Sequence, residues 1–330
     1  MKQRFLVTGG AGYVGSHLVA ELLDRGAACV VLDNFCTGHH EAVLSGARLI
    51  EGGLADADLL DAVLADGPWD AVFHFAARSL VGESMRDPML YFIENAGNGA
   101  RLIDACVRHG VRRFVLSSTA ALFGRPSTEP LAEDAPIEPG SAYGESKHMI
   151  ERMLTWADRV HGLRSACLRY FNAAGADPGG RLGEDHRPET HLIPLVIDAA
   201  LGRRDTLEVF GDDFATPDGT AVRDYVHVAD LTDAHLRVLG QLEQGSVAYN
   251  LGTGRGHSVL EVVRAVERAG GRRVPLRHVG RRPGDPPMLV ASSARITAET
   301  GWRPRFTVLD DIVATALQWR EAHPAGYGIL

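Results

Sequence analysis

The segment Arg4-Phe5-Leu6-Val7-Thr8-Gly9-Gly10-Ala11-Gly12-Tyr13-Val14-Gly15 decides the fold of this 330-residue chain. Its first five residues predict a short buried strand, and an apolar periodicity after the glycines predicts a helix to about Asp24. Glycines where a strand becomes a helix allow a tight turn, let the backbone approach a pyrophosphate and pack helix against strand. The helix N-terminus then offers free N–H groups to phosphates.

The second predicted strand ends in an acid, Asp33. An acid at this point is placed to hydrogen-bond the ribose hydroxyls of an adenine dinucleotide. Neither Arg nor Lys follows within several residues, so a 2′-phosphate would meet repulsion instead of a partner. The sequence therefore favours NAD over NADP.

Strand and helix patterns alternate along the first half of the chain. Predicted strands lie at Ala28–Asp33, Arg48–Glu51, Ala71–Phe75, Arg113–Ser117, Ser165–Phe171 and Val247–Leu251. Predicted helices lie at Asp58–Ala65, Met89–His109, Ser146–Val160, Leu192–Leu201, Leu260–Ala269 and Leu309–Arg320. This alternation predicts an α/β protein with a doubly wound parallel Rossmann sheet, covered by helices on both faces.

The regular alternation of strand and helix patterns ends after about Asn172, where turn-rich stretches appear at 177–185 and 211–220. We expect residues 1–172 to form an NAD-binding Rossmann domain, whose sheet is completed by later segments near 221–255. Residues 173–330 should mostly form a smaller C-terminal substrate-binding lobe. Because neither a repeat nor a long linker separates the two, we expect one unit with a cleft between them.

Composition narrows the class of protein. A hydrophobic content of 45% and a formal charge of −8 describe a globular protein and argue against a nucleic-acid partner. Apolar runs fall short of the ~20 residues that span a bilayer, and the strand begins too early to leave room for a signal peptide. The cysteines are scattered and lack a Cys-x-x-Cys pair, so we expect reduced thiols in a cytoplasmic protein, without a metal or disulfides. They are Cys29, Cys36, Cys106 and Cys167.

The segment Tyr143-Gly144-Glu145-Ser146-Lys147 joins a weak base to a partner that can activate it. A Tyr and a Lys four residues apart on a helix lie on the same face. The ordinary pKa of a phenol is near ~10, but a fixed ammonium, helped by an oxidised nicotinamide, favours the phenolate. This spacing is common by itself. The dinucleotide-binding opening upstream makes Tyr143 and Lys147 a candidate catalytic pair.

Further motifs accompany this pair over essentially the whole chain. They are Asp33-Asn34, His74-Phe75-Ala76-Ala77, Leu116-Ser117-Ser118-Thr119, Arg169-Tyr170-Phe171-Asn172, Gly183-Glu184-Asp185, Pro217-Asp218-Gly219-Thr220, Val222-Arg223-Asp224-Tyr225-Val226-His227 and Arg282-Pro283-Gly284-Asp285. Together they resemble the UDP-glucose 4-epimerase family of the extended short-chain dehydrogenase/reductases. The combination is far more specific than any single motif.

The resemblance implies an NAD-dependent inversion at C4′ of a UDP-hexose through a transient 4-keto sugar, which interconverts UDP-glucose and UDP-galactose. Tyr143 would take the proton of the 4′-hydroxyl while C4′ passes a hydride to NAD. Thr119 would hydrogen-bond the same hydroxyl, and Lys147 would bind the nicotinamide ribose. Thr119 is followed by Ala120 and Ala121, which cannot supply the carboxylates that a sugar-nucleotide dehydratase needs.

The resemblance also implies two sets of binding residues. The cofactor set is Gly9, Gly12, Tyr13, Val14, Gly15, Asp33, Asn34, Phe75, Ala76, Ala77, Ser117, Tyr143, Lys147 and Tyr170. The UDP-sugar set is Thr119, Tyr143, Asn172, His191, Leu192, Leu207, Val209, Phe210, Arg223, Arg282, Asp285 and Leu289. Arg suits diphosphate oxygens and Asp suits ribose hydroxyls, although either Arg would also serve a surface ion pair. Leu207, Val209 and Phe210 fit an apolar wall under the uracil or ordinary strand packing.

Four positions depart from the family pattern. Gly53 stands where an acid usually contacts the adenine amine, with Asp56 a nearby substitute. Ser79 stands where a Lys is frequent, although Arg78 is adjacent, and His191 stands where an Asn commonly touches the UDP phosphates. The fourth position is Leu289, whose size is intermediate between residues that exclude and residues that admit an N-acetylated sugar.

Because of Leu289, the sugar range stays open: a 4-epimerase of UDP-N-acetylhexosamine, or of UDP-xylose and UDP-arabinose, is the enzymatic alternative. A non-catalytic NAD-binding sensor is another, but such sensors usually lack the Tyr–Lys pair. A net-oxidising dehydrogenase is a third. The resemblance also implies a homodimer joined through a four-helix bundle of the amphipathic helices at Met89–His109 and Ser146–Val160, although the protein's own core would satisfy both faces equally well.

Overall fold

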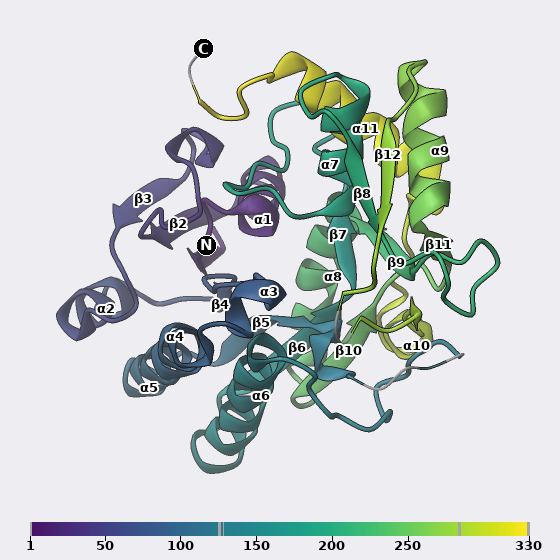
Figure 1. Ribbon diagram of the computed structural model, residues 1–330. Helices are drawn as coiled ribbons and strands as arrows, with labels where there is room; N and C mark the ends of the chain where they lie inside the picture. The colour runs from purple at the N-terminus through teal and green to yellow at the C-terminus, as the bar shows by residue number, and fades with distance from the viewer. Residues whose placement is uncertain (1, 125–126, 128, 283–284, 329–330) are drawn as a thin grey trace.

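The computed structural model describes residues 2–124, 127, 129–282 and 285–328 (Figure 1). Its centre is a seven-stranded sheet in the order β10-β6-β5-β4-β1-β2-β3, in which every pair is parallel. The strands are β1 (Arg4–Thr8), β2 (Ala28–Asp33), β3 (Arg48–Glu51), β4 (Ala71–His74), β5 (Arg113–Thr119), β6 (Arg164–Tyr170) and β10 (Val247–Leu251). The predicted doubly wound Rossmann fold is confirmed.

Helices cover both faces of this sheet, as its apolar strands require. Packed against one face are α1 (Tyr13–Asp24), α8 (Val228–Gln241) and α10 (Ala294–Thr300). Packed against the other are α2 (Ala57–Ala65), α5 (Asn98–Arg108) and α6 (Ala142–His161), with Trp69, Leu102 and Leu154 among the buried side chains.

The predicted helix at Met89–His109 is divided into three parts. The first part is α4 (Pro88–Tyr91), the second is a π-helical turn at Phe92–Gly97, and the third is α5. The short helix α3 (Val81–Ser84) precedes them. π-Helical turns within α-helices are frequent at functional sites, because they redirect side chains.

The C-terminal half adds a second core on the right of Figure 1, where α7 (Leu192–Ala200), α9 (Val259–Gly270) and α11 (Leu309–Ala322) pack together. Two small sheets join it. One contains β7 (Asn172–Ala174), β9 (Val222–His227), β11 (Gly256–Ser258) and β13 (Met288–Leu289), and the other pairs β8 (Leu207–Phe210) with β12 (Leu276–Val279).

Only part of the expected completion of the main sheet is observed. Of the segments near 221–255, β10 joins the seven-stranded sheet beside β6. β9 instead lies between β11 and β13 in the second sheet, and β7 also pairs with it. Among the described residues, a helix long and apolar enough to cross a membrane is absent.

Candidate active site

The glycine turn after β1 forms a cradle that other residues would fill. Gly9 has φ +73°, and a Cβ there would lie 2.3 Å from the Ala76 backbone nitrogen. A Cβ on Gly15 would lie 2.2 Å from the Gly9 carbonyl oxygen. The N–H groups of Phe75 and Ala76 donate to the carbonyl of Thr8 at 2.8 and 3.0 Å, which fixes the loop after β4 beside the turn. Gly12 occupies the N-cap of α1 without a capping side chain, so the N–H groups of this helix end stay available to phosphate.

Asp33 ends β2 beside this cradle. It is 7% exposed, and its two oxygens accept hydrogen bonds from the N–H groups of Ala11 and Phe35, each at 2.9 Å. Burial raises the pKa of Asp33, and these bonds oppose the rise. A carboxylate oxygen can accept more than one hydrogen bond, so both bonds leave capacity for ribose hydroxyls.

Gly53 and Asp56 are the two positions considered for the adenine side of the site. Gly53 lies beside Asn34, since a Cβ on Gly53 would be 3.8 Å from Asn34 Nδ2. Asp56, the substitute acid considered above, caps α2 by accepting from the Leu59 N–H at 3.0 Å. Its carboxylate therefore has a structural partner already.

Tyr143 and Lys147 both lie in the first two turns of α6. The helix starts earlier than predicted because the Ser141 hydroxyl caps it, accepting from the Gly144 N–H at 3.1 Å. Lys147 is 2% exposed, and its Nζ donates to the Ser117 carbonyl at 2.8 Å. Tyr143 is hydrogen-bonded to Thr119. Thus α6 and the end of β5 bring the three predicted catalytic residues together.

Burial opposes charge on both members of this pair. Burial lowers the pKa of Lys147 to about 8, with the Glu151 carboxylate opposing the change. Burial also raises the pKa of Tyr143, and the bond to Thr119 works against it. The fold alone therefore does not activate the phenol; an additional positive charge beside it is needed to favour the phenolate.

The sequence analysis overlooked a buried ion pair behind the catalytic residues. Arg169 on β6 donates to Glu151 on α6 through Nε at 3.0 Å and a terminal nitrogen at 2.6 Å, and both side chains are less than 10% exposed. The Ser118 hydroxyl on β5 donates to Glu151 at 2.6 Å. This network fastens α6 to both strands. Its signal in the sequence is that Glu151 follows Lys147 by four residues, on the same helix face.

Asn95 in the π-helical turn is a second residue that the sequence analysis missed. It is 1% exposed, accepts from the Arg78 N–H at 2.8 Å, and donates to the Arg78 carbonyl and the Ser146 hydroxyl, each at 3.0 Å. Asn95 thus ties the loop after β4 to α6. The signal was a polar residue in the apolar face of a helix.

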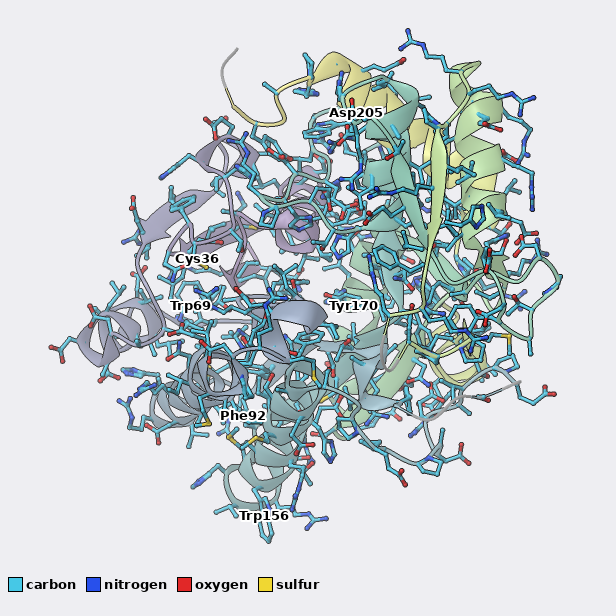
Figure 2. All side chains as sticks on the ribbon, in the orientation of Figure 1. Cys36, Trp69, Phe92, Trp156, Tyr170 and Asp205 are labelled. Atoms are coloured by element: carbon cyan, nitrogen blue, oxygen red, sulfur yellow. The ribbon has the colours of Figure 1, made fainter. Side chains whose placement is uncertain are left out.

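The remaining cofactor candidates surround these groups. The Tyr170 hydroxyl is hydrogen-bonded to the Ser117 hydroxyl, and the Tyr13 hydroxyl donates to the Gly175 carbonyl at 2.6 Å. Val14 packs against the core on the α1 face of the sheet, and Ala77 is partly buried in the loop after β4. Figure 2 labels Tyr170 near the middle of the molecule, between the two halves.

On the other side of the site, β9 and β13 bring three UDP-sugar candidates together. Arg223 is ion-paired with Asp285, and Leu289 pairs with Arg223 in the register of the two parallel strands. The Arg282 guanidinium lies 3.8 Å from the centre of the Phe210 ring. Pro283 and Gly284 of the same motif lie outside the described residues. Asn172 begins β7, opposite Tyr225 of β9.

The expected apolar wall is only partly available. Leu207 and Val209 are 2% and 0% exposed and belong to the core of the second half, so their side chains serve strand packing. Phe210 is only partly buried and carries Arg282 on its face. At the start of α7, His191 occupies the N-cap position, with Nδ1 2.5 Å from Glu184 Oε1, and the Leu192 side chain packs against the same core.

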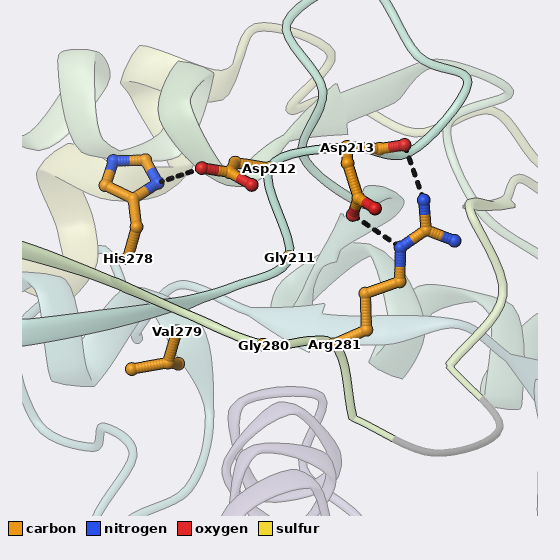
Figure 3. Close-up of a pocket in the computed structure, with 7 residues that line it drawn as sticks. All are labelled: Gly211, Asp212, Asp213, His278, Val279, Gly280 and Arg281. Atoms are coloured by element: carbon orange, nitrogen blue, oxygen red, sulfur yellow. Dashed lines mark hydrogen bonds and ion pairs between the residues drawn. The ribbon is translucent and has the colours of Figure 1, made fainter.

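A pocket of about 320 Å³ lies where β8 and β12 end (Figure 3). Asp213 is ion-paired with Arg281 at this pocket, and Asp212 Oδ2 lies 3.5 Å from His278 Nδ1. Its lining is Gly211, Asp212, Asp213, His278, Val279, Gly280 and Arg281. None of the catalytic candidates lines this pocket. Its first lining residue, Gly211, directly follows the UDP-sugar candidate Phe210 in the sequence.

A Rossmann sheet with a glycine cradle, an acid at the end of β2 and a Tyr–Lys pair beside a Thr, the Lys buried and the Tyr partly buried, defines a dinucleotide-dependent protein of the short-chain dehydrogenase/reductase class. Residues 5–252 match the model of the NAD dependent epimerase/dehydratase family. The chain belongs to this family. The resemblance stated from the motifs is confirmed.

Individual relatives cover almost the whole chain. A UDP-glucose 4-epimerase of Lacticaseibacillus casei is 46% identical over 98% of both chains. The crystal structure of UDP-glucose 4-epimerase from Brucella ovis in complex with NAD has a TM-score of 0.93 and 44% identity, over 96% of this chain and 98% of that one. The Bifidobacterium longum enzyme in complex with NAD⁺ and UDP also has a TM-score of 0.93, at 35% identity over 98% and 100%.

Proposed function

We propose that this protein is an NAD-dependent UDP-glucose 4-epimerase, which inverts C4′ of a UDP-hexose through a transient 4-keto sugar. The observation that carries the proposal is the convergence of Tyr143, Lys147 and Thr119 at the end of β5, close to the loop that abuts the glycine cradle. The relatives that share this fold along nearly their whole length are named for the same activity.

The residues around the cradle fit NAD. Gly9 and Gly15 leave room that a Cβ would occupy, and the uncapped start of α1 suits a pyrophosphate. Asp33 suits the adenosine ribose. When bound, NAD accepts the hydride from C4′ and later returns it, and its oxidised nicotinamide supplies the positive charge that the phenol of Tyr143 needs.

This chain's own residues move the proton. Tyr143 takes the proton of the sugar 4′-hydroxyl as C4′ is oxidised and gives it back on reduction. Thr119 is hydrogen-bonded to Tyr143 and would also hydrogen-bond the sugar 4′-hydroxyl, which holds that group beside the base. Among the described residues, Lys147 Nζ donates only to the Ser117 carbonyl, so two of its three N–H donors would be available to a ribose of the cofactor.

Substrate anchoring is assigned to the second half, residues 173–330, together with Asn172. Arg223 and Arg282 suit the diphosphate, and Asp285 suits the uridine ribose. Inversion requires the 4-ketose to turn over while the nucleotide stays fixed, and these contacts hold the nucleotide end. Ala120 and Ala121, which follow Thr119 directly, leave the site without the carboxylates that dehydration requires.

The decisive experiment is incubation of the purified protein with UDP-galactose. We expect UDP-glucose to accumulate to an equilibrium mixture without net formation of NADH. An oxidised sugar with stoichiometric NADH would instead identify a dehydrogenase, and an unchanged substrate with bound NAD would identify a sensor. Parallel assays with UDP-glucose, UDP-N-acetylglucosamine and UDP-xylose define the sugar range.

A homodimer belongs to the same proposal. Apolar side chains that are 39–64% exposed cluster on α3, α4, the π-helical turn and α6, elements that pack on one another. They are Val81, Met85, Met89, Ile93, Met149, Trp156 and Val160. Trp156 lies at the outer end of α6 (Figure 2). Burying such an apolar patch against a second copy of the chain removes it from water, which is favourable.

The four cysteines are all unpaired, which favours a cytoplasmic location.

A further inference from the structure

Four side chains before α7 form a cluster of which only His191 belongs to the predicted UDP-sugar set. Glu184, His186, Glu189 and His191 each offer one ligand atom, and these four atoms lie within 4.8 Å of one another. We propose that this cluster is a binding site for a divalent transition-metal ion of the Zn²⁺ type. The other three residues of the cluster are outside the predicted cofactor and UDP-sugar sets.

The spacing of the ligand atoms suits such an ion. His186 Nδ1 lies 3.4 Å from Glu184 Oε1 and 3.7 Å from Glu189 Oε2. Tetrahedral coordination with bonds of ~2.0–2.2 Å places neighbouring ligand atoms roughly 3.4 Å apart. His191 Nδ1 lies closer, 2.5 Å from Glu184 Oε1, and the two atoms would have to move apart around an ion.

Two of the ligand atoms, His186 Nδ1 and Glu189 Oε2, are buried and lack a hydrogen-bond partner among the described residues, although they face each other at 3.7 Å. The other oxygen of Glu189 accepts from the N–H groups of Thr190 and His191 at 2.8 and 2.9 Å, which fixes the carboxylate and directs Oε2 into the cluster. Buried polar atoms without partners are rare in folded proteins and point to a missing ligand.

The surrounding structure holds the ligands in place. The Glu184 carbonyl accepts from Arg320 of α11 at 3.3 Å, and the Asp185 carbonyl is bonded to His39 at 3.0 Å. The Tyr13 ring lies edge-on to His186, 6.2 Å away. Glu184 and Glu189 are about nine-tenths buried, whereas His191 is 44% exposed and leaves an entry path for the ion.

Two imidazoles with two carboxylates favour Zn²⁺ over Mg²⁺, which prefers six oxygen ligands.

The test uses tag-free full-length protein, stripped with a chelator, dialysed against Zn²⁺ and then against metal-free buffer. We expect about one retained Zn²⁺ per chain by mass spectrometry of the metal, and a rise in Tm with Zn²⁺ that Mg²⁺ does not give. His186→Ala and the nearly isosteric Glu189→Gln should lose both effects. His278→Ala, which removes a half-exposed histidine paired with Asp212, should keep them.

Circular dichroism and bound NAD report whether each variant is folded. Equal Zn²⁺ retention by the wild type and both cluster variants would overturn the proposal, as would a wild type that retains none. Glu189→Gln keeps the side-chain volume, so an unfolded His186→Ala does not remove the comparison. Epimerase activity, assayed separately on the metal-stripped protein, bears on the proposed function alone.

Discussion

At the scale of single residues, the site depends on a phenol that its own surroundings keep protonated. Burial raises the pKa of Tyr143, and the ammonium of Lys147 is itself weakened by burial to a pKa of about 8. In the proposed reaction the pair would therefore become an effective base only with the positive charge of the bound, oxidised cofactor. Proton transfer would then be coupled to the redox state of the cofactor.

Tyr143→Phe tests this role. The substitution keeps the ring and removes the hydroxyl, so kcat should fall by roughly 10²–10⁴-fold while the affinity for UDP stays close to that of the wild type. Steady-state kinetics and UDP titration measure the two quantities. Turnover near the wild-type value would show that another group is the base.

Leu289 is predicted to limit the sugar. It lies opposite Arg223 in the register of β13 and β9, and Arg223 is proposed to bind the diphosphate. An N-acetyl group enlarges the volume that the ketose sweeps, and overpacking costs about 1–3 kcal/mol, or roughly 5- to 150-fold in kcat/KM. Leu289→Ser should raise activity on UDP-N-acetylglucosamine and change activity on UDP-glucose much less. An unaltered ratio of the two kcat/KM values would assign the selectivity to another residue.

At the scale of secondary-structure elements, α6 is the component that must be held in register. The hydroxyl of Ser141 begins it, the carbonyl of Ser117 binds Lys147, and Glu151 is locked to β5 and β6 by Ser118 and Arg169. Asn95 adds a bond to Ser146 from the neighbouring π-helical turn. The α6 residues that make these contacts lie within about two helical turns of Tyr143 and Lys147, so they fix the part of the helix that carries this pair.

Glu151→Gln measures how strongly α6 is held. Removing one partner leaves the Arg169 guanidinium buried without its counter-charge, which typically costs about 3–5 kcal/mol in the free energy of unfolding. Denaturant unfolding would quantify the loss. Asp104→Asn is the control, since it breaks an exposed pair with Arg108 and should cost under ~1 kcal/mol. Equal losses in both variants would mean that the buried pair does not hold the helix.

The sequence was most informative where local periodicity and position coincide. The strands from Arg4–Thr8 to Arg48–Glu51 agree with prediction at both ends, because apolar runs and glycine turns bound them. Neither β13 nor β7 was predicted, since strands of two or three residues have no periodicity and depend on tertiary pairing. Likewise the roles of Asn95 and Arg169 could not be predicted, because their partners are distant in the sequence and meet them only in the folded protein.

At the scale of the whole molecule, the exposed apolar side chains of α3, α4 and α6 predict an assembly of two chains. Light scattering should give about 71 kDa, twice the 35.5 kDa of one chain. Trp156→Glu places a charge in the apolar patch and should shift the population toward monomer. The control Val308→Glu changes another exposed apolar residue, 47% exposed against 61% for Trp156, at the N-cap of α11 and should leave the mass unchanged. A wild type that stays at the mass of one chain at micromolar concentration would refute the dimer.

The late arrival of β10 also has a consequence for biosynthesis. β6 emerges from the ribosome with one edge unpaired, and its partner Val247–Leu251 is translated only after β7, α7, β8, β9 and α8. At roughly 5–20 residues per second, that edge stays open for several seconds. An open strand edge invites pairing with other nascent chains. Slow translation through this interval, or removal of the second half, should therefore favour aggregation over folding of the first half.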